Sequence, residues 1–229
     1  MNHWIIAPIL LPAIMAPILL MSARHDIVLA RVFSLASTVA LLGIALALGS
    51  MVGDGQILTY ALGNWVAPFG IVLVADRLSV LMLVLSALLA LAVLFFAIDG
   101  GDRDGRHFHA LYQFQLMGIN GAFLTGDFFN LFVFFEVLLI ASYGLMVHGG
   151  GPARVRAGVQ YVVINLVGST LFLIAVGMIY SVAGTLNMAD LALKVPQVVA
   201  ADQALLQAGA LLLLLVFCIK AALVPVHFW

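Results

Sequence analysis

Charged residues are scarce in this sequence, and their scarcity excludes most kinds of protein. Only 8% of the 229 residues are charged, whereas 65% are hydrophobic and the mean hydropathy is +1.23. A soluble domain carries about 25% charged residues, so this chain lacks the charge to cover a water-facing surface. Its apolar runs are roughly twice as long as the ten-residue alternating strands of a membrane barrel. Helices that cross a bilayer remain, because each satisfies its own backbone hydrogen bonds.

Other features are also missing. The single cysteine, Cys218, cannot form an internal disulfide, and the net charge of −1 gives no basic face for nucleic acid. No spacing of His, Cys or acidic residues suggests a metal site, and phosphate-binding glycine loops and nucleophile motifs are absent. We therefore expect no metal, no cofactor and a transporter rather than an enzyme. Residues 1–25 lack the basic start of a secretory signal, so we expect them to remain as a first span.

Seven apolar segments, each about as long as a bilayer-spanning helix, divide the chain. They cover residues 4–22, 28–50, 76–98, 108–126, 128–148, 156–183 and 204–225. The sequence thus predicts an all-α, polytopic transmembrane bundle, with three helices in residues 1–107 and four further spans in residues 108–229. Residues 51–75 form a long external connection, and their run GNWVAPFGIVLVAD favours a short hairpin.

The basic residues of the connections alternate between the two sides of the predicted bundle. The first, third and fifth breaks between the apolar segments hold six basic residues, namely Arg24, Arg31, Arg103, Arg106, Arg154 and Arg156. The even-numbered breaks hold only Arg77 and Lys194. The positive-inside rule then places the odd-numbered breaks in the cytoplasm and the N-terminus outside. We expect a multi-pass protein of the cell (inner) membrane.

Glu136 and Lys220 are the two charges that lie deep inside predicted spans. Glu136 is the only glutamate of the chain, and it lies eight residues into its segment, roughly 12 Å deep at 1.5 Å per residue. Ionisable groups at this depth cost on the order of 2.5–3.5 kcal/mol each and usually mark ion or proton relays. We predict that the pair handles protons. A static ion pair that only fixes helix packing is the competing interpretation.

Pro225 lies five positions after Lys220. Proline removes a helix hydrogen bond, so we expect the seventh span to be broken near Pro225, and broken helices at membrane depth commonly form ion sites. His227 follows the break; a place in the proton relay competes here with a histidine that is merely hydrogen-bonded at a helix break. His109 and His148 lie at span ends and are interpreted as interfacial.

Polar residues within the apolar spans are expected mostly to form hydrogen bonds between helices. A water molecule held in a proton path is the alternative for each of them. They are Asn120, Asn165, Ser169 and Thr170.

Three stretches carry a resemblance to a known family. These are GDFFNLFVFFEVLLIASYGLM, QYVVINLVGSTLFLIAVGMIYSVAGTLNMADLA and KAALVPVHFW. They resemble the proton-translocating antiporter-like subunits shared by Mrp-type cation/proton antiporters and respiratory complex I. GTLNMADLA, with GIVLVADRLSVLM upstream, is most similar to the D-type subunits of Mrp antiporters. The resemblance covers essentially the whole chain.

The resemblance implies roles for the two buried charges. The family's essential glutamate of the fifth span falls on Glu136, and the lysine of its broken seventh span falls on Lys220. The lysine would exchange protons, and the glutamate would modulate its charge state. Family members continue past KAALVPVHFW with a second inverted five-helix repeat. We therefore expect residues 108–229 to be an incomplete first repeat, truncated before its last helix.

Two functions are consistent with this resemblance. The first is the coupling of proton uptake to the efflux of Na⁺ or another monovalent cation, within a hetero-oligomeric membrane complex of Mrp subunits. The alternative is a homologous proton-pumping subunit of a complex I-like NADH:quinone oxidoreductase or of a membrane-bound hydrogenase. A third interpretation, a membrane scaffold whose buried charges only hold helices together, predicts that Lys220→Met leaves activity intact.

Overall fold

The protein folds mainly into long helices in the computed structural model, which describes residues 3–22, 25–65, 67–105 and 107–229. Arg24 and Arg106, two basic residues of the predicted orientation, lie outside the described residues. The long helices are α1 (Ala7–Ser22), α2 (Ile27–Val52), α3 (Arg77–Gly100), α4 (Phe108–Leu124), α5 (Phe128–Met146), α6 (Pro152–Ala183) and α8 (Ala200–Lys220). The short elements are η1 (His3–Ile5), β1 (Leu58–Ala61), η2 (Leu62–Asn64), β2 (Val72–Ala75), η3 (Asp102–Asp104), α7 (Met188–Lys194) and η4 (Val195–Gln197).

Each of the seven predicted spans contains one long helix. Within the described residues, α2, α3, α5, α6 and α8 are the 5 helices long and apolar enough to cross a membrane. Helices α1 and α4, with 16 and 17 residues, are shorter than the roughly 20 residues that a span requires. The all-α membrane bundle is confirmed, whereas the count of seven spans stays a prediction.

Side-chain caps set several helix starts. The carboxylate of Asp26 accepts hydrogen bonds from the backbone of Val28 and Leu29 at the start of α2. Asp76 and Ser79 form a reciprocal capping box at the start of α3. Such caps satisfy backbone N–H groups that have no partner within the helix. The helix starts are therefore encoded locally, by acidic residues that directly precede apolar runs.

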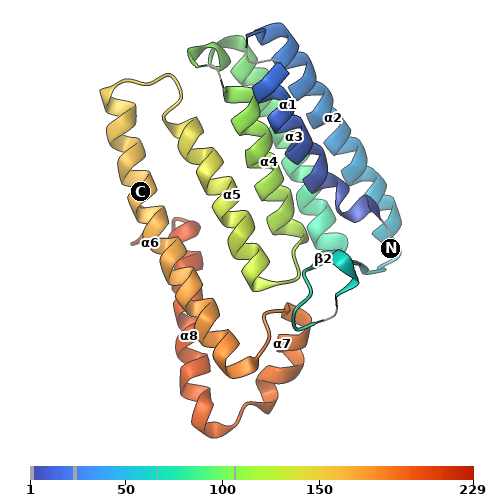
Figure 1. Ribbon diagram of the computed structural model, residues 1–229, viewed down its shortest axis with the longest axis vertical. Helices are drawn as coiled ribbons and strands as arrows, with labels where there is room; N and C mark the ends of the chain where they lie inside the picture. The colour runs from blue at the N-terminus through green and yellow to red at the C-terminus, as the bar shows by residue number, and fades with distance from the viewer. Residues whose placement is uncertain (1–2, 23–24, 66, 106) are drawn as a thin grey trace.

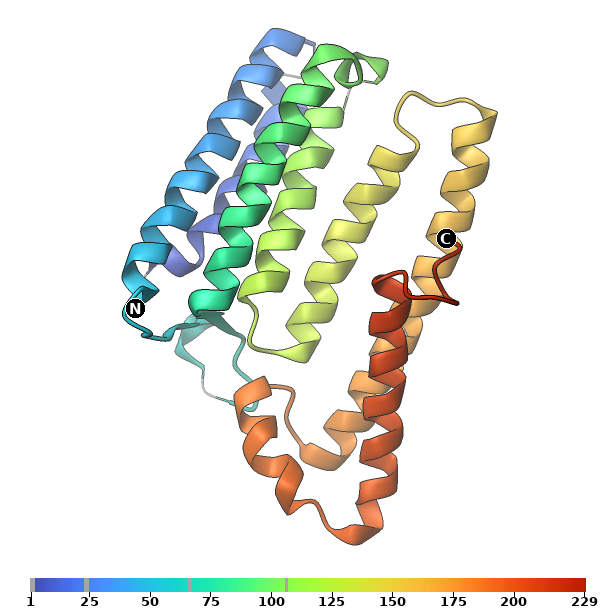
Figure 2. The ribbon, with the colours of Figure 1, turned by 180° about the vertical axis from the view of Figure 1, so that it is seen from behind.

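The long helices form two groups (Figure 1). Helices α1 to α4 pack into one bundle, and α5 lies along α4. Seen from behind, α6 and α8 run side by side as a separate pair (Figure 2). Helices α4 and α5 approach each other closely, because a Cβ added at Gly118 would lie 2.6 Å from the Cβ of Leu138. Only a glycine permits this approach of the two backbones.

One end of the bundle is built around the hairpin predicted for residues 51–75. Strands β1 and β2 pair antiparallel, with Leu58 opposite Ala75, so a hairpin exists in this connection, but its first strand precedes the run GNWVAPFGIVLVAD for which it was predicted. The turn between α4 and α5 joins it, because Gly126 N donates to Val72 O at 2.8 Å. The turn between α6 and α7 joins as well, through a bridge of Asp127 with Asn187. The even-numbered breaks and the N-terminal η1 thus gather at this end (Figure 1).

The odd-numbered breaks meet at the opposite end. His148, after α5, lies 3.1 Å from the carbonyl oxygen of Gly101, after α3. Arg154, at the start of α6, lies 3.8 Å from Asp104. The alternation deduced from the basic residues therefore matches the arrangement of the described helices. Which end faces the cytoplasm remains a prediction.

Candidate functional site

Lys220 is the last residue of α8, and the helix breaks there. Ala222 adopts a left-handed conformation with φ 54, and Leu223 N closes the turn on Cys218 O at 3.0 Å. A left-handed residue just past a helix end is a common way to stop it. The expected break near Pro225 exists, but the helix ends at Lys220, five residues before the proline. The break thus leaves the lysine at a helix end.

Helix α6 supplies uncharged partners for Lys220. The Lys220 ammonium donates to the carbonyl oxygen of Asn165 at 3.3 Å and to the hydroxyl of Ser169 at 3.0 Å. Asn165 and Ser169 are buried, with 2% and 5% of their surface exposed. Between them, Gly168 lies beside the lysine stem, and a Cβ there would make only an ordinary van der Waals contact, at 3.6 Å from Lys220 Cε. The ammonium is therefore held by neutral oxygens of one neighbouring helix.

Glu136 lies on α5 with one carboxylate oxygen unsatisfied. Its Oε1 is buried and has no hydrogen-bond partner among the described residues. No ion pair joins Glu136 directly to Lys220 in the part of the chain that the structure describes, although their charges interact electrostatically. A buried acceptor without a partner is costly to keep. A proton or a water molecule on Oε1 would relieve that cost.

Helix α4 fixes the part of α5 that carries Glu136. Gly118 contacts Leu138, and Gly121 is equally close to the ring of Phe134. These two contacts lie two residues after and two residues before Glu136. Because interiors are close-packed and stiff, α4 restricts the movement of the carboxylate along the α5 axis.

A group of hydroxyls near Glu136 was not predicted from the sequence. Tyr143, two helical turns beyond Glu136 on α5, experiences its charge. The Tyr143 ring packs edge-on against Tyr161 of α6, with centroids 5.7 Å apart. The Tyr161 hydroxyl in turn lies 3.1 Å from that of Ser142. The spacing of seven residues between Glu136 and Tyr143 was the signal in the sequence, since such residues share a helix face.

The remaining predicted residues are placed less uniformly. His227 and Pro225 lie in the segment after α8, and both are exposed. The hydrogen bonds found among the described residues include none to the His227 ring. Asn120 donates to Pro8 O at 2.9 Å, which confirms one predicted bond between helices. Thr170 instead donates to Leu166 O of its own helix at 3.0 Å, so that expectation was wrong for Thr170.

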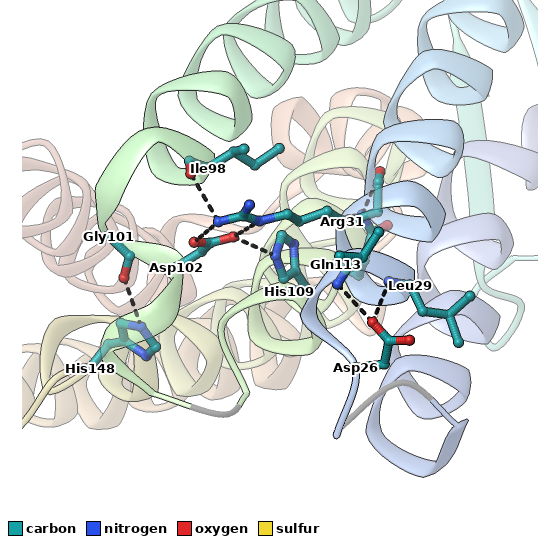
Figure 3. A network of polar contacts seen from close by, with 11 residues as sticks. Asp26, Leu29, Arg31, Ile98, Gly101, Asp102, His109, Gln113 and His148 are labelled. Carbon is teal, nitrogen blue, oxygen red and sulfur yellow. Dashed lines mark hydrogen bonds and ion pairs between the residues drawn. The ribbon is translucent and has the colours of Figure 1, made fainter.

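A second polar cluster lies at the start of α4, at the end of the bundle where the odd-numbered breaks meet (Figure 3). Arg31 of α2 binds both oxygens of Asp102, with Nε at 2.6 Å from Oδ2 and Nη2 at 2.7 Å from Oδ1. His109 Nε2 lies 3.1 Å from the same Oδ2. Asp102 is completely buried and His109 is 4% exposed. His109 thus lies at the start of α4, at a span end as predicted, and it is buried there beside Asp102.

Burial by itself would raise the pKa of the Asp102 carboxyl. The hydrogen bonds from Arg31 and His109 outweigh that effect and hold the pKa below its ordinary value. By their positions in the sequence alone, Asp102 and Arg31 would be ordinary loop charges. This buried pair was therefore not predicted.

The arrangement as a whole is suited to proton chemistry. Among the described residues, no group of three or more His, Cys, Asp and Glu side chains is placed to hold a metal ion. The groups brought together near mid-bundle are instead a carboxylate, an ammonium and hydroxyls. All of these groups can accept or donate protons.

The chain is similar to known proteins over its whole length. Residues 125–229 match the family described as NADH:quinone oxidoreductase/Mrp antiporter, TM. The chain is 47% identical, over its whole length, to the D subunit of a probable K(+)/H(+) antiporter from Rhizobium meliloti, of which it covers 43%. It is 46% identical to the D subunit of a Na(+)/H(+) antiporter from Alkalihalophilus pseudofirmus, again over 100% of the chain and 46% of the relative.

A solved structure supports the same relationship. A chain in the structure of the Mrp complex from Dietzia sp. superposes on all of this protein with a TM-score of 0.90 and 34% identity, and the match covers 43% of that chain. The protein thus spans about half the length of the relatives it matches. Its apolar helices and this relationship make it a multi-pass membrane protein. We conclude that the chain belongs to the NADH:quinone oxidoreductase/Mrp antiporter family and is similar over its whole length to D subunits of cation/proton antiporters.

Proposed function

We propose that this chain is the proton-handling part of a D-type subunit in a multisubunit monovalent cation/proton antiporter, with Glu136 and Lys220 as its relay. The observation that carries the proposal is the unpaired state of both charges. Lys220 is bound by neutral oxygens only, and Glu136 Oε1 has no partner among the described residues. A charge without a fixed counterion at membrane depth is typical of proton pathways.

In the proposed mechanism the two charges control each other across α5, α6 and α8. A proton on the Glu136 carboxylate removes the negative charge that favours ammonium at Lys220. Lys220 then releases its proton more readily, and Asn165 O and Ser169 Oγ keep its nitrogen in place. Proton uptake at one group and release at the other would thereby be linked. The partners we propose are other Mrp-type subunits, because the named relatives are subunits of such antiporters.

The exchanged cation belongs to the proposal as well. The two relatives named above are described as a K(+)/H(+) and an Na(+)/H(+) antiporter subunit. We propose a monovalent cation and take Na⁺ as the first to test. The alternative, a proton-pumping subunit of a redox-driven complex, is supported by the shared family description. Neighbouring genes separate the two: small Mrp-type subunits favour the antiporter, and NADH- or hydrogenase-type subunits favour the redox complex.

The experiment uses the full-length protein in its complex, in a strain without native antiporters. Glu136→Gln and Lys220→Met keep the side-chain length and remove the charge. We expect each to abolish sodium tolerance and to lower proton flux in inverted vesicles at least about tenfold, an effect of roughly 1.4 kcal/mol on the barrier. Lys194→Met is the matched control, since Lys194 is partly exposed and forms an ion pair with Asp190 on its own helix.

One result would contradict the relay. If both variants assembled normally and kept wild-type sodium tolerance, the buried charges would only hold helices together. His227→Gln tests the third predicted member of the relay in the same assay. Unchanged proton flux in that variant would remove His227 from the pathway and leave the other two residues in place.

A further inference from the structure

His109 is bound at one ring nitrogen and left open at the other. Its Nε2 lies 3.1 Å from Asp102 Oδ2. Its Nδ1 is buried and has no hydrogen-bond partner among the described residues, and the whole residue is 4% exposed. Buried polar atoms are almost always paired, so an unpaired one requires a reason. A histidine that served only to join helices would gain by using both nitrogens.

Opposing effects act on His109: burial, Arg31 and His148 favour the neutral ring, whereas the Asp102 carboxylate favours the imidazolium. Arg31 holds Asp102 with two short hydrogen bonds and balances its charge, so His109 need not be positive to neutralise the carboxylate. From the turn after α5, His148 acts on it electrostatically. On its own helix, the Tyr112 hydroxyl is engaged with Ala90 O at 2.6 Å.

Both protonation states also keep the same contact. Nε2–H donates to Asp102 whether or not a proton sits on Nδ1, so gain or loss of that proton breaks no hydrogen bond. Histidine is the side chain whose ordinary titration falls between pH 5 and 8. The geometry at His109 therefore leaves the second nitrogen free to titrate.

We propose that His109 is a second proton-binding site of this protein, separate from Glu136 and Lys220, in which Nδ1 takes up the proton. Asp102 and Arg31 are positioning residues: Asp102 fixes the ring through Nε2, and Arg31 fixes Asp102. The site lies at the end of the bundle where the odd-numbered breaks meet (Figure 3), the end predicted to face the cytoplasm. The proton comes from solution at that end and returns to it.

A polar seam between α2 and α4 continues from this site. One turn after His109, Gln113 Nε2 donates to Ser34 Oγ at 3.2 Å, and Ser37 Oγ donates to Gln113 Oε1 at 2.9 Å. These three side chains are buried. A charge appearing on His109 acts on this seam and hence on α4, which packs against α5 at Gly118. The site is thereby connected, through one helix, to the segment that carries Glu136.

The role of the site rests on the proposed function: the charge on His109 would set the pH dependence of cation/proton exchange. The existence of the site does not rest on it, so titration and transport are measured separately. Titration is followed on the full-length complex with ¹⁵N-labelled histidine, by infrared difference spectra of the imidazole bands between pH 5 and 8.5. We expect one titrating histidine that is lost in His109→Gln and kept in His148→Gln and Glu136→Gln.

Gln at position 109 can still donate a hydrogen bond to Asp102 but cannot take up a proton. If His109→Gln does not assemble, Asp102→Asn keeps His109 in place. We expect it to shift the midpoint of the same histidine by about one pH unit, since the facing charge is removed. Spectra of His109→Gln identical to those of the wild type, or a midpoint unmoved in Asp102→Asn, would overturn the proposal.

Transport measurements then test whether the charge on His109 sets the pH dependence of cation/proton exchange. In His109→Gln we expect the pH profile of proton flux to move by roughly one pH unit, with the maximal flux within about twofold of the wild type. The control His3→Gln, at the opposite end of the bundle beside Tyr60, should keep the wild-type profile. A profile that stays unchanged in His109→Gln, while the spectra show the titration, would overturn the assigned role. Failure of the relay itself would appear instead as full transport in Glu136→Gln.

Discussion

Buried charges are paired in one region of the molecule and unpaired in another. At the end formed by α2, η3 and α4, Asp102 receives two hydrogen bonds from Arg31, at 2.6 and 2.7 Å. Near mid-bundle, on α5 and α8, Glu136 and Lys220 form no direct ion pair among the described residues, and Lys220 is bound by uncharged oxygens. One carboxylate is saturated, whereas the other keeps a free oxygen.

This difference separates a structural charge from a chemical one. A bidentate arginine–carboxylate pair is short, strong and geometrically specific, so Asp102 stays ionised and ties three elements together. Charges that lack a fixed counterion at membrane depth are expensive, and they are typically retained for ion or proton movement. We therefore attribute stability to the Arg31–Asp102 pair and propose proton exchange for Glu136 and Lys220.

The largest expected effect tests whether the buried Arg31–Asp102 pair stabilises the fold. Asp102→Ala leaves Arg31 and His109 without their common acceptor, and breaking a buried pair in this way is strongly destabilising. We expect the free energy of unfolding of the full-length protein in detergent to fall by about 3 kcal/mol. Denaturant titration followed by circular dichroism provides the measurement.

Asp104→Ala is the matched control, because it lies two residues away in the same turn. Its carboxylate is about half exposed and lies 3.8 Å from Arg154, and exposed ion pairs contribute little to stability. Equal losses in Asp102→Ala and Asp104→Ala would contradict the assignment. They would mean that burial of Asp102 has no energetic consequence.

The local features of this fold were predictable from the sequence. Apolar runs gave the helices, and the breaks between these runs gave their approximate ends. Glu136 and Lys220 were found because each interrupts an apolar run. The hairpin in residues 51–75 followed from its turn residues and strand-like run.

The features that escaped prediction depend on tertiary contacts. Arg31 and Asp102 are 71 residues apart, and each looked like an ordinary loop charge. The partners of Lys220 are 55 and 51 residues away, and one of them is a backbone carbonyl, which carries no sequence signal. The helix break shortly after Lys220 was predicted from Pro225, but the left-handed residue that follows α8 was not, because it is an alanine rather than a glycine.

The second-largest expected effect tests whether α4 positions the part of α5 that carries Glu136. Gly118→Ala would place a Cβ 2.6 Å from the backbone nitrogen of Leu138, which cannot rotate away. We expect α4 and α5 to separate, with a loss of about 2 kcal/mol in unfolding free energy and loss of proton flux. In the control Gly177→Ala, the added methyl meets no atom within 4 Å, so flux should be unchanged. Normal flux in Gly118→Ala would show that the close contact does not matter for Glu136.

The smallest expected effect concerns the two uncharged oxygens that accept hydrogen bonds from Lys220. Ser169→Ala removes the hydroxyl that lies 3.0 Å from the ammonium and leaves the Asn165 carbonyl in place. A hydrogen bond to a charged group contributes about 1.5 kcal/mol, so we expect proton flux to fall roughly tenfold without loss of assembly. Thr170→Ala is the control, because the neighbouring Thr170 is exposed and its hydroxyl donates to Leu166 O of its own helix.

Since Lys220 lacks a carboxylate partner among the described residues, its position depends on these few uncharged contacts. Equal flux in Ser169→Ala and Thr170→Ala would show that the lysine is held by something other than α6, and the contrast with the paired Asp102 would then disappear.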